Sequence, residues 1–593
     1  MKRVREQREC LVSRVPRLQV LLAVSLIVIA TAYWRVQVVQ GDLYHGLAEN
    51  NRLRRVPIKA TRGLIFDRNG RVLVDNVPSY NLLLDRTRSN DIDAALAFVA
   101  EVLDQGVPAL ETAIERQADS SPYEPILLAE NLTLADVSRI SIAELEFPEF
   151  QIDVEHLRLY RHGSLTAHIL GYLGEATEAD LARDPDNYSA GDLVGREGVE
   201  RVFDLLLRGR DGERELVVDS RGRTRTEHGR RPARSGNNLH LTLDLELQQE
   251  ATRYLEGRAG AAVALDPRNG EVLMLVSAPS YDPSLFTRRL NSEQWRELVE
   301  SPNHPLQNRT IQNTHAPGSI FKVVLANAGL TEGTIEPSDS VFCAGSTQIY
   351  NRRTRCWLRR GHGWVNLRRA IKESCDIYFY HLGQKLGINR IAHYARLFGL
   401  GRPTGFDIPG EKAGLIPDTE WSLTHRRSPW YPGETISVAI GQGPILVTPL
   451  QVARMIAVLA NGGRLVTPHV RRGSRSPLSA PIAVDPQAIS FVREAMWAVV
   501  NEEHGTGLSV RLQGIDIAGK TGTVQVVEQK SWTSNEDLPE QLRDHAWFAS
   551  FAPASDPELV VVAFVEHGGH GSAAAAPLVK LIYETYFRAS DPS

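Results

Sequence analysis

The sequence has little of what a nucleic-acid-binding, repetitive or polytopic protein needs. Its formal net charge is −4, and no concentrated basic face of the kind that binds nucleic acid stands out. No motif recurs at a fixed period, which argues against a solenoid or a propeller. Long apolar runs are scarce too, since a single segment of the 593 residues is long enough for a bilayer. The chain is therefore not a channel. Its 42% hydrophobic and 23% charged residues favour several globular domains.

The apolar segment lies near the N-terminus. Residues 18–39 carry one charge, Arg35, and approach the ~20 residues of a spanning helix. In residues 1–17, six basic residues face two acidic ones, so the positive-inside rule places them in the cytoplasm and exports the rest. The small residues Ala30-Thr31-Ala32 leave a cleaved signal peptide as the alternative. The sequence thus predicts a single-pass anchor in the inner membrane, with the bulk of the chain in the periplasm.

The exported part changes in character near residue 236. Before this point, a turn at Asn69-Gly70 between apolar runs predicts a hairpin, and residues 92–117 show helical periodicity. An Arg-rich stretch, 208–234, has the composition of a solvated hairpin and linker. After this point, residues 260–276 predict a second apolar hairpin. The predicted organisation is a tail (1–17), an anchor (18–39) and two exported domains (40–236 and 237–589).

The first chemical motif is Pro317-Gly318-Ser319-Ile320-Phe321-Lys322, followed by an apolar run. The Pro-Gly turn predicts that Ser319 lies at a helix N-terminus, with Lys322 on the same face three residues later. A serine hydroxyl needs a base before it acts as a nucleophile, and a partly desolvated lysine can supply one. Alone, Ser-x-x-Lys is a weak signal, because many matches are ordinary surface pairs.

Two further motifs follow in the chain. Ser374-Cys375-Asp376 comes after a helical pattern, and Ala518-Gly519-Lys520-Thr521-Gly522-Thr523 lies in a strand-like run. Without a side chain at Gly522, an extended ligand could approach and pair along this strand. Lys520, Thr521 and Thr523 offer a cation and two hydroxyls, a set suited to a carboxylate.

The three motifs occur in the order known for serine enzymes that react with penicillin. Ser374 follows Ser319 by 55 positions, and Lys520 follows Ser374 by 146. Segments such as RGLIFDRNG, VGREGVERVFD, AIGQGPILVTPLQVA and DHAWFASFAP extend the resemblance over most of residues 60–590. The chain resembles the class B penicillin-binding proteins, and most closely the penicillin-binding protein 2 group of rod-shape elongation. Asp376 stands where most of the family carries Asn.

This resemblance implies a fold and a set of roles. The expected fold is multidomain: the transmembrane helix, an elongated α+β pedestal, and an α/β transpeptidase domain with a central antiparallel sheet flanked by helices. The implied roles make Ser319 the nucleophile, Lys322 its general base, Ser374 a proton relay and Asp376 a member of their network. Lys520, Thr521, Gly522 and Thr523 would bind the substrate, and the N–H groups of Ser319 and Thr523 would form the oxyanion hole.

The implied activity is D,D-transpeptidation of peptidoglycan stem peptides through an acyl-enzyme with release of D-Ala, inhibited by β-lactams. No glycosyltransferase domain is evident, so the resemblance implies a SEDS-family polymerase and the elongation machinery as partners. Three alternatives remain open. A D,D-carboxypeptidase or β-lactamase would use water as acceptor, a β-lactam sensor would need a signalling domain, and a structural activator of the polymerase would need little chemistry.

The cysteines suggest a metal. Cys343, Cys356 and Cys375 lie within 33 residues and enclose His362, which together make a Cys3His zinc set in composition. Cys375 lies inside the second motif, so a bound ion would hold residues 343–362 against the predicted catalytic wall. Penicillin-binding protein 2 relatives carry zinc at matching positions with carboxylates among the ligands. A Cys343–Cys356 disulfide or inert buried thiols remain the alternatives. No cofactor is expected for the acyl transfer itself.

Overall fold

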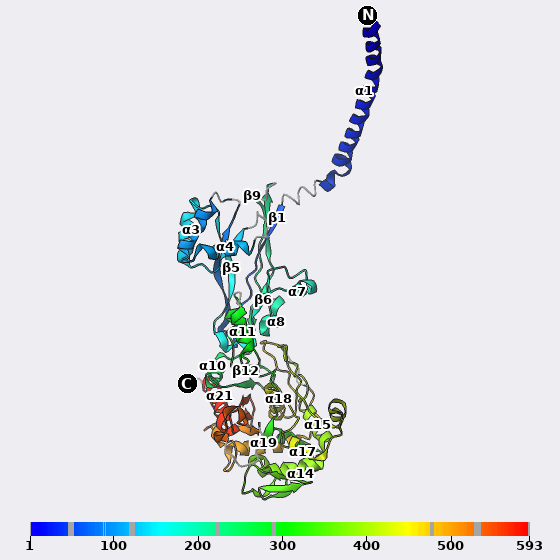
Figure 1. Ribbon diagram of the computed structural model, residues 1–593. Coiled ribbons are helices and arrows are strands. Elements are labelled where there is room, and N and C mark those ends of the chain that lie inside the picture. The colour runs from blue at the N-terminus through cyan, green and yellow to red at the C-terminus, as the bar shows by residue number, and fades with distance from the viewer. Residues whose placement is uncertain are drawn as a thin grey trace. The chain divides into compact units, whose positions relative to one another are not determined.

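The computed structural model describes residues 2–44, 53–86, 88, 91–117, 125–219, 224–287, 292–474, 479–526 and 535–590. The chain begins with helix α1 (Lys2–Trp34), which continues into a π-helical turn, η1 (Arg35–Val39) (Figure 1, blue). Among the described residues, this is the one helix long and apolar enough to cross a membrane, over Val15–Val39. Its large apolar side chains are exposed, as in a helix that faces lipid. The predicted span at 18–39 lies within it.

The chain forms two compact units whose segments alternate along the sequence. The first unit comprises Met1–Arg62, Val77–Leu157 and Arg208–Gly236; the second comprises Gly63–Asn76, Arg158–Leu207 and Asn237–Ser593. The predicted division of the exported part into two domains, 40–236 and 237–589, therefore stays a prediction. By contacts, two stretches that precede residue 236 pack with the larger, C-terminal unit.

The first unit contains small antiparallel sheets and short helices. The Arg-rich stretch forms the expected hairpin, because β8 pairs antiparallel with both β9 and β1. The helical pattern over 92–117 is divided into α3 and α4 at Gly106, with Pro108 in the first turn of α4, where a missing N–H costs nothing. Its elements are β1 (Leu53–Ile58), α3 (Ile92–Val102), α4 (Val107–Glu115), β4 (Ile126–Ala129), α5 (Leu134–Ile142), β8 (Gly212–Val218) and β9 (Thr224–Arg231). Two longer strands, β3 (Val72–Leu84) and β5 (Phe150–Tyr160), belong to this unit only over Val77–Leu84 and Phe150–Leu157.

A five-stranded antiparallel sheet organises the second unit, in the order β12-β11-β19-β18-β17. Both faces are buried, because alternate residues of β19 enter two different cores. Val562 packs in the core that contains α12 and α18, whereas Val561 packs in the core that contains α10 and α21. The expected sheet flanked by helices is confirmed. The strands are β11 (Gly260–Leu265), β12 (Val272–Ala278), β17 (Ala518–Val524), β18 (His545–Ala552) and β19 (Leu559–Val565).

The helices around this sheet carry the motifs to its edge. Strand β17 ends the sheet, so one side of it is free of any partner strand among the described residues. The helices are α10 (Leu245–Tyr254), α12 (Lys322–Thr331), α13 (Leu367–Lys372), α14 (Asp376–Leu386), α15 (Ile388–Leu397), α17 (Pro432–Val438), α18 (Pro449–Ala460), α19 (Pro486–Asn501), α20 (Gly571–Ala574) and α21 (Ala576–Ser590).

An insertion, residues 340–366, lies between α12 and α13. It forms two small antiparallel pairs, β13 (Ser340–Cys343) with β16 (Gly363–Asn366) and β14 (Ser346–Ile349) with β15 (Arg352–Arg355).

The second unit also contains several shorter elements. They are β2 (Ile65–Phe66), α6 (Ala167–Leu170), β6 (Leu173–Glu175), α7 (Glu178–Arg183), β7 (Leu193–Gly195), α8 (Gly198–Val202), α9 (Asp204–Arg208), β10 (Leu239–His240), α11 (Ser292–Glu300) and α16 (Thr419–Trp421).

Candidate active site

Ser319 lies in a single 3-10 turn, η5 (Gly318–Phe321), that leads directly into α12. The turn approaches strand β17 closely because Gly318 has no side chain. Its φ is +55°, and a Cβ there would lie 2.7 Å from the carbonyl oxygen of Thr523. Within the described residues, the half-buried Ser319 hydroxyl has no hydrogen-bond partner. The serine is thus held beside the edge strand by its backbone, with its oxygen uncommitted.

Lys322 is completely buried, and its ammonium group is directed to the second motif. Nζ donates to the carbonyl oxygen of Ser374 at 2.9 Å and to Ser374 Oγ at 3.1 Å. It also lies 2.6 Å from Oδ1 of Asp376 and 5.5 Å from the ring centre of Phe379. A buried ammonium needs such partners, because burial removes its water.

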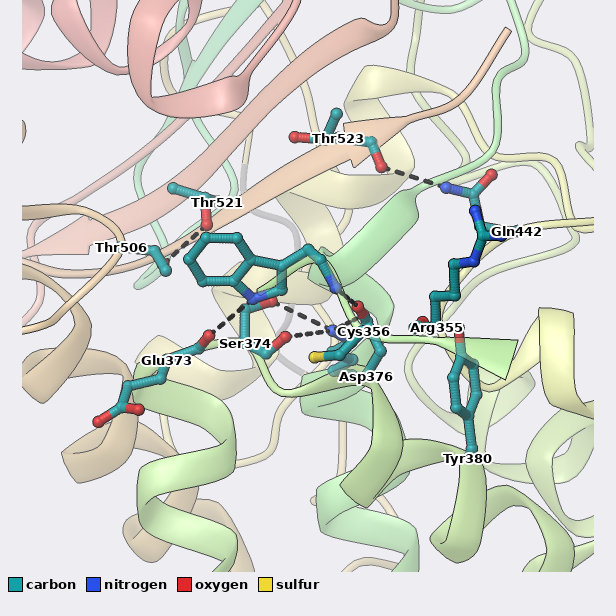
Figure 2. A network of polar contacts seen from close by, with 12 residues as sticks. Arg355, Cys356, Glu373, Ser374, Asp376, Tyr380, Gln442, Thr506, Thr521 and Thr523 are labelled. Carbon is teal, nitrogen blue, oxygen red and sulfur yellow. Dashed lines mark hydrogen bonds and ion pairs between the residues drawn. The ribbon is translucent and has the colours of Figure 1, made fainter. Parts of the chain in front are cut away.

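Ser374 lies between two lysines. It adopts a left-handed backbone conformation, with φ +55°, just before α14 begins. Its Oγ accepts from Lys520 Nζ at 2.9 Å as well as from Lys322. Asp376, the first residue of α14, uses its second oxygen to accept from the backbone N–H of Trp357 at 2.9 Å. Figure 2 shows Ser374 and Asp376 in this network. The first two motifs and the third therefore meet at one point.

Lys520 projects from β17 into the interior. Its Nζ donates to Ser374 Oγ and to the carbonyl of Thr521, the latter at 3.0 Å. Burial, together with the nearby charge of Lys322, holds the pKa of the Lys520 amine well below its ordinary value. An anion arriving beside this amine would favour its charged form.

The remaining residues of the third motif line the edge of β17. Thr521 Oγ1 lies 2.8 Å from Thr506 Oγ1, and the carbonyl of Thr523 accepts from Gln442 Nε2 at 3.2 Å (Figure 2). Sequence reasoning missed Thr506 and Gln442 as site residues. Gln442 had a signal, because it belongs to the family-like segment AIGQGPILVTPLQVA, whereas Thr506 follows no motif.

Gly522 has a structural role that the sequence argument did not anticipate. A Cβ at Gly522 would lie 3.0 Å from Trp547 Cβ and 3.1 Å from both Ile320 Cγ1 and the carbonyl oxygen of Pro317. The missing side chain therefore lets β17 pack against the turn that carries Ser319. Access of a ligand to the strand, the role we expected for this glycine, stays a prediction.

The four predicted metal ligands come together beside this network. The ligand atoms of Cys343, Cys356, His362 and Cys375 all lie within 4.8 Å of one another, and all four residues are buried. All three cysteines are free thiols, so the alternative disulfide is not formed. Burial raises the pKa of the Cys343 thiol. A buried Cys3His cluster of this kind can hold a metal.

Two distances within the cluster are those expected between ligands of one tetrahedral metal ion. His362 Nδ1 lies 3.5 Å from Cys343 Sγ and 3.6 Å from Cys356 Sγ. In a tetrahedral zinc site, bonds of about 2.3 Å to sulfur and about 2.05 Å to nitrogen separate the two ligand atoms by about 3.6 Å. The donor set and these two distances suit a tetrahedral metal ion.

Comparisons with known proteins give the same picture over nearly the whole chain. The model of the penicillin-binding protein transpeptidase domain matches residues 260–584, and that of the penicillin-binding protein dimerisation domain matches residues 57–241. The peptidoglycan D,D-transpeptidase MrdA of Acinetobacter baumannii is 36% identical over 580 residues, which cover 95% of this chain and 86% of that protein. MrdA of Haemophilus influenzae is 35% identical, covering 94% and 89%.

Two solved structures have similar folds. The penicillin-binding protein PBP2 of Helicobacter pylori, in a complex with MreC, superposes with a TM-score of 0.81 at 29% identity, covering 91% of this chain and 99% of that one. PBP2 of Pseudomonas aeruginosa, in complex with WCK 5153, gives a TM-score of 0.68 at 33% identity, covering 90% and 96%.

Proposed function

This chain belongs to the class B penicillin-binding proteins and is a peptidoglycan D,D-transpeptidase, and from this premise we propose that Ser319 and the network around Lys322 carry its chemistry. The observation that carries the proposal is the meeting of three distant motifs. Lys322 and Lys520 both donate to the hydroxyl of Ser374, and the turn of Ser319 packs on the strand that holds Lys520.

In the first half-reaction, Ser319 Oγ attacks the carbonyl carbon of the penultimate D-Ala of a stem peptide. The hydroxyl proton passes to Lys322, which acts as the base after it has lost the proton that pairs it with Asp376. The C–N bond then breaks, and the terminal D-Ala leaves with a proton that Lys322 delivers through Ser374. The 3.1 Å contact from Lys322 Nζ to Ser374 Oγ supports this route. An amine of a neighbouring stem then attacks the ester carbonyl, the C–O bond to Ser319 breaks, and a proton from the amine returns to Ser319 Oγ through Lys322.

Two features of β17 fit the donor stem. The terminal carboxylate would bind to Lys520 with the hydroxyls of Thr521 and Thr523, and its negative charge would stabilise the buried ammonium. The scissile carbonyl oxygen would lie between the backbone N–H groups of Ser319 and Thr523. Such a pair of donors lowers the barrier by several kcal/mol in comparable sites, on the order of 3 for one donor. A β-lactam would occupy the same positions and acylate Ser319.

A structural zinc ion would be held by Cys343, Cys356, His362 and Cys375. Bound there, it would fix the insertion 340–366 to the start of α14, since Cys375 directly precedes Asp376. Asp376 in turn accepts from Trp357 of the insertion and from Lys322. The ion would thus maintain the shape of the network and take no part in acyl transfer.

The apolar helix over Val15–Val39 would anchor the chain in the inner membrane, with the rest in the periplasm. A separate polymerase of the SEDS family would supply glycan strands. Support comes from two relatives: one belongs to a peptidoglycan synthase complex that couples polymerisation and crosslinking, and PBP2 of Helicobacter pylori forms a complex with MreC. The enzyme would therefore act in cell elongation.

The experiment that tests the assignment is covalent labelling of the full-length protein with a fluorescent penicillin. Wild type should form a stable adduct, while Ser319→Ala should not, although it remains folded by circular dichroism. An adduct that persists in Ser319→Ala would contradict the choice of nucleophile. Cross-linking of uncross-linked pentapeptide strands then separates a transpeptidase from a carboxypeptidase, which would release D-Ala without forming cross-links.

A further inference from the structure

The insertion 340–366 presents four aromatic side chains to solvent. Phe342, Tyr350, Trp357 and Trp364 are 55%, 54%, 53% and 67% exposed. Phe342 and Trp364 are directly opposite each other on β13 and β16, with ring centres 5.5 Å apart. Exposed aromatics grouped in this way mark a binding surface more often than solvent-facing residues that occur singly.

The same segment is strongly basic. Residues 340–366 contain five arginines and no aspartate or glutamate, within a chain whose net charge is −4. Arg353, Arg355, Arg359 and Arg360 are exposed. Aromatic rings interleaved with arginines suit a ligand that combines flat apolar surface with carboxylates, because guanidinium groups pair with carboxylates in a fixed geometry.

The folding of the insertion turns these side chains outward. Phe342 precedes Cys343, Trp357 follows Cys356, and Trp364 lies two positions after His362. The three ligand residues are buried, and each neighbouring aromatic is exposed. The cluster of cysteines and histidine is therefore the interior of the insertion, and the aromatics form its outer surface.

Trp357, one of the four exposed aromatics, adjoins the catalytic network. The backbone N–H of Trp357 donates to Asp376 at 2.9 Å, and the indole Nε1 donates to the carbonyl of Glu373 at 3.0 Å. A ligand on the insertion that extends to Trp357 would thus lie next to the second motif. The donor stem is accounted for by β17 and Ser319, whereas no residue assigned so far holds the acceptor.

We propose that the aromatic face, defined as Phe342, Tyr350, Trp364, Arg353 and Arg360, binds the acceptor strand of peptidoglycan. The proposal rests on the proposed function. Sugar rings of a glycan strand stack on exposed aromatic rings, and its stem peptides carry free carboxylates that match the arginines. The charge of the insertion excludes a basic partner, and its position beside Asp376 places the bound strand where the acyl-enzyme must be attacked.

The test measures binding of uncross-linked glycan strands with pentapeptide stems to full-length protein carrying Ser319→Ala. Two double variants test the face independently. One replaces the aromatic pair, Phe342→Ser with Trp364→Ser, and the other replaces two arginines, Arg353→Glu with Arg360→Glu. Each pair should weaken binding by about fivefold or more, as the loss of anchoring residues does at other interfaces. The control Trp295→Ser removes a 47% exposed tryptophan from α11 and should leave binding unchanged.

The same pairs of changes, made with Ser319 intact, separate this proposal from the proposed function. Penicillin labelling of Ser319 should stay at the wild-type rate, while cross-linking of strands falls about fivefold. Unchanged strand binding in both pairs would overturn the proposal. The proposal would also be overturned if the substitutions reduced binding to vesicles of anionic phospholipid but not binding to glycan strands. The face would then be a membrane-contacting surface. Lost penicillin labelling would overturn it too. A wild type that never reacts with penicillin would refute the proposed function, and strand binding would still be measurable.

Discussion

The carboxylate of Asp376 is shared between Lys322 and the insertion. Oδ1 lies 2.6 Å from Nζ of Lys322, and Oδ2 accepts the backbone N–H of Trp357. The ammonium is fully buried and the carboxylate nearly so. This chain therefore keeps a buried ion pair directly beside Ser374.

Removing one partner of this pair should destabilise the fold. We expect Asp376→Ala to lower the free energy of unfolding by about 3–5 kcal/mol, because the buried ammonium of Lys322 loses its counter-charge. The double change Lys322→Met with Asp376→Leu should recover much of this loss, since no charge is then buried. Chemical denaturation of wild type, the double variant and its two single changes, Lys322→Met and Asp376→Leu, measures the coupling. Strictly additive losses would show that the two side chains do not stabilise each other.

A methyl group at Gly522 should separate the edge strand from the nucleophile. Gly522→Ala places a Cβ 3.0–3.1 Å from Trp547, Ile320 and Pro317, and the neighbours must move. We expect penicillin acylation to slow by about tenfold or more, because small displacements of a reacting group are costly. Gly433→Ala, whose Cβ meets nothing within 4 Å, is the control. Stopped-flow measurement of the acylation rate compares Gly522→Ala with wild type and with the control, after their melting temperatures are shown to be equal. Equal acylation rates would mean that β17 tolerates the displacement.

Metal removal should loosen the insertion. We expect the purified protein to contain one zinc ion per chain, and Cys356→Ser to lose it together with several degrees of thermal stability. Elemental analysis and thermal denaturation give both values without recourse to activity. Cys10→Ser, which changes the cysteine outside the cluster, should alter neither. Wild-type protein that is free of metal and melts at the same temperature after chelation would refute the zinc assignment.

Acid should destabilise the second unit through a buried histidine. Burial lowers the pKa of His168 from 6.5 to about 4, and Arg309 adds to this effect. Between these pH values the unfolded chain binds a proton that the folded chain does not. Stability is therefore complete above pH ~6.5 and falls as the pH drops toward ~4, by up to about 3 kcal/mol from this residue.

The variant His168→Leu tests this effect directly. Its melting temperature should depend less on pH between 4 and 6.5 than that of wild type, because one titrating group is gone. His393→Leu, a change at an exposed histidine on α15, serves as the control and should leave the pH dependence as it is. An unchanged slope in His168→Leu would assign the acid sensitivity to other groups.

The sequence predicted the framework of the site better than its contacts. The antiparallel sheet and the hairpins follow from apolar patterns and Asn-Gly turns, which act over a few residues and are visible in one sequence. The ion pair of Lys322 with Asp376 and the contact of Thr521 with Thr506 depend on tertiary packing between distant segments. Likewise, the alternation of the two compact units could not be predicted from composition, because it depends on which surfaces are buried together.

One hydrogen-bonding group on the free edge of strand β17 is already occupied before a substrate arrives. Gln442 already donates to the carbonyl of Thr523, one of the groups that an added strand would use. A stem peptide that pairs there must displace this amide, so it exchanges one hydrogen bond for another. Such an exchange yields little net affinity. Weak capture suits an enzyme that must release one polymer and move to the next, and it leaves the covalent bond to Ser319 as the step that commits a strand.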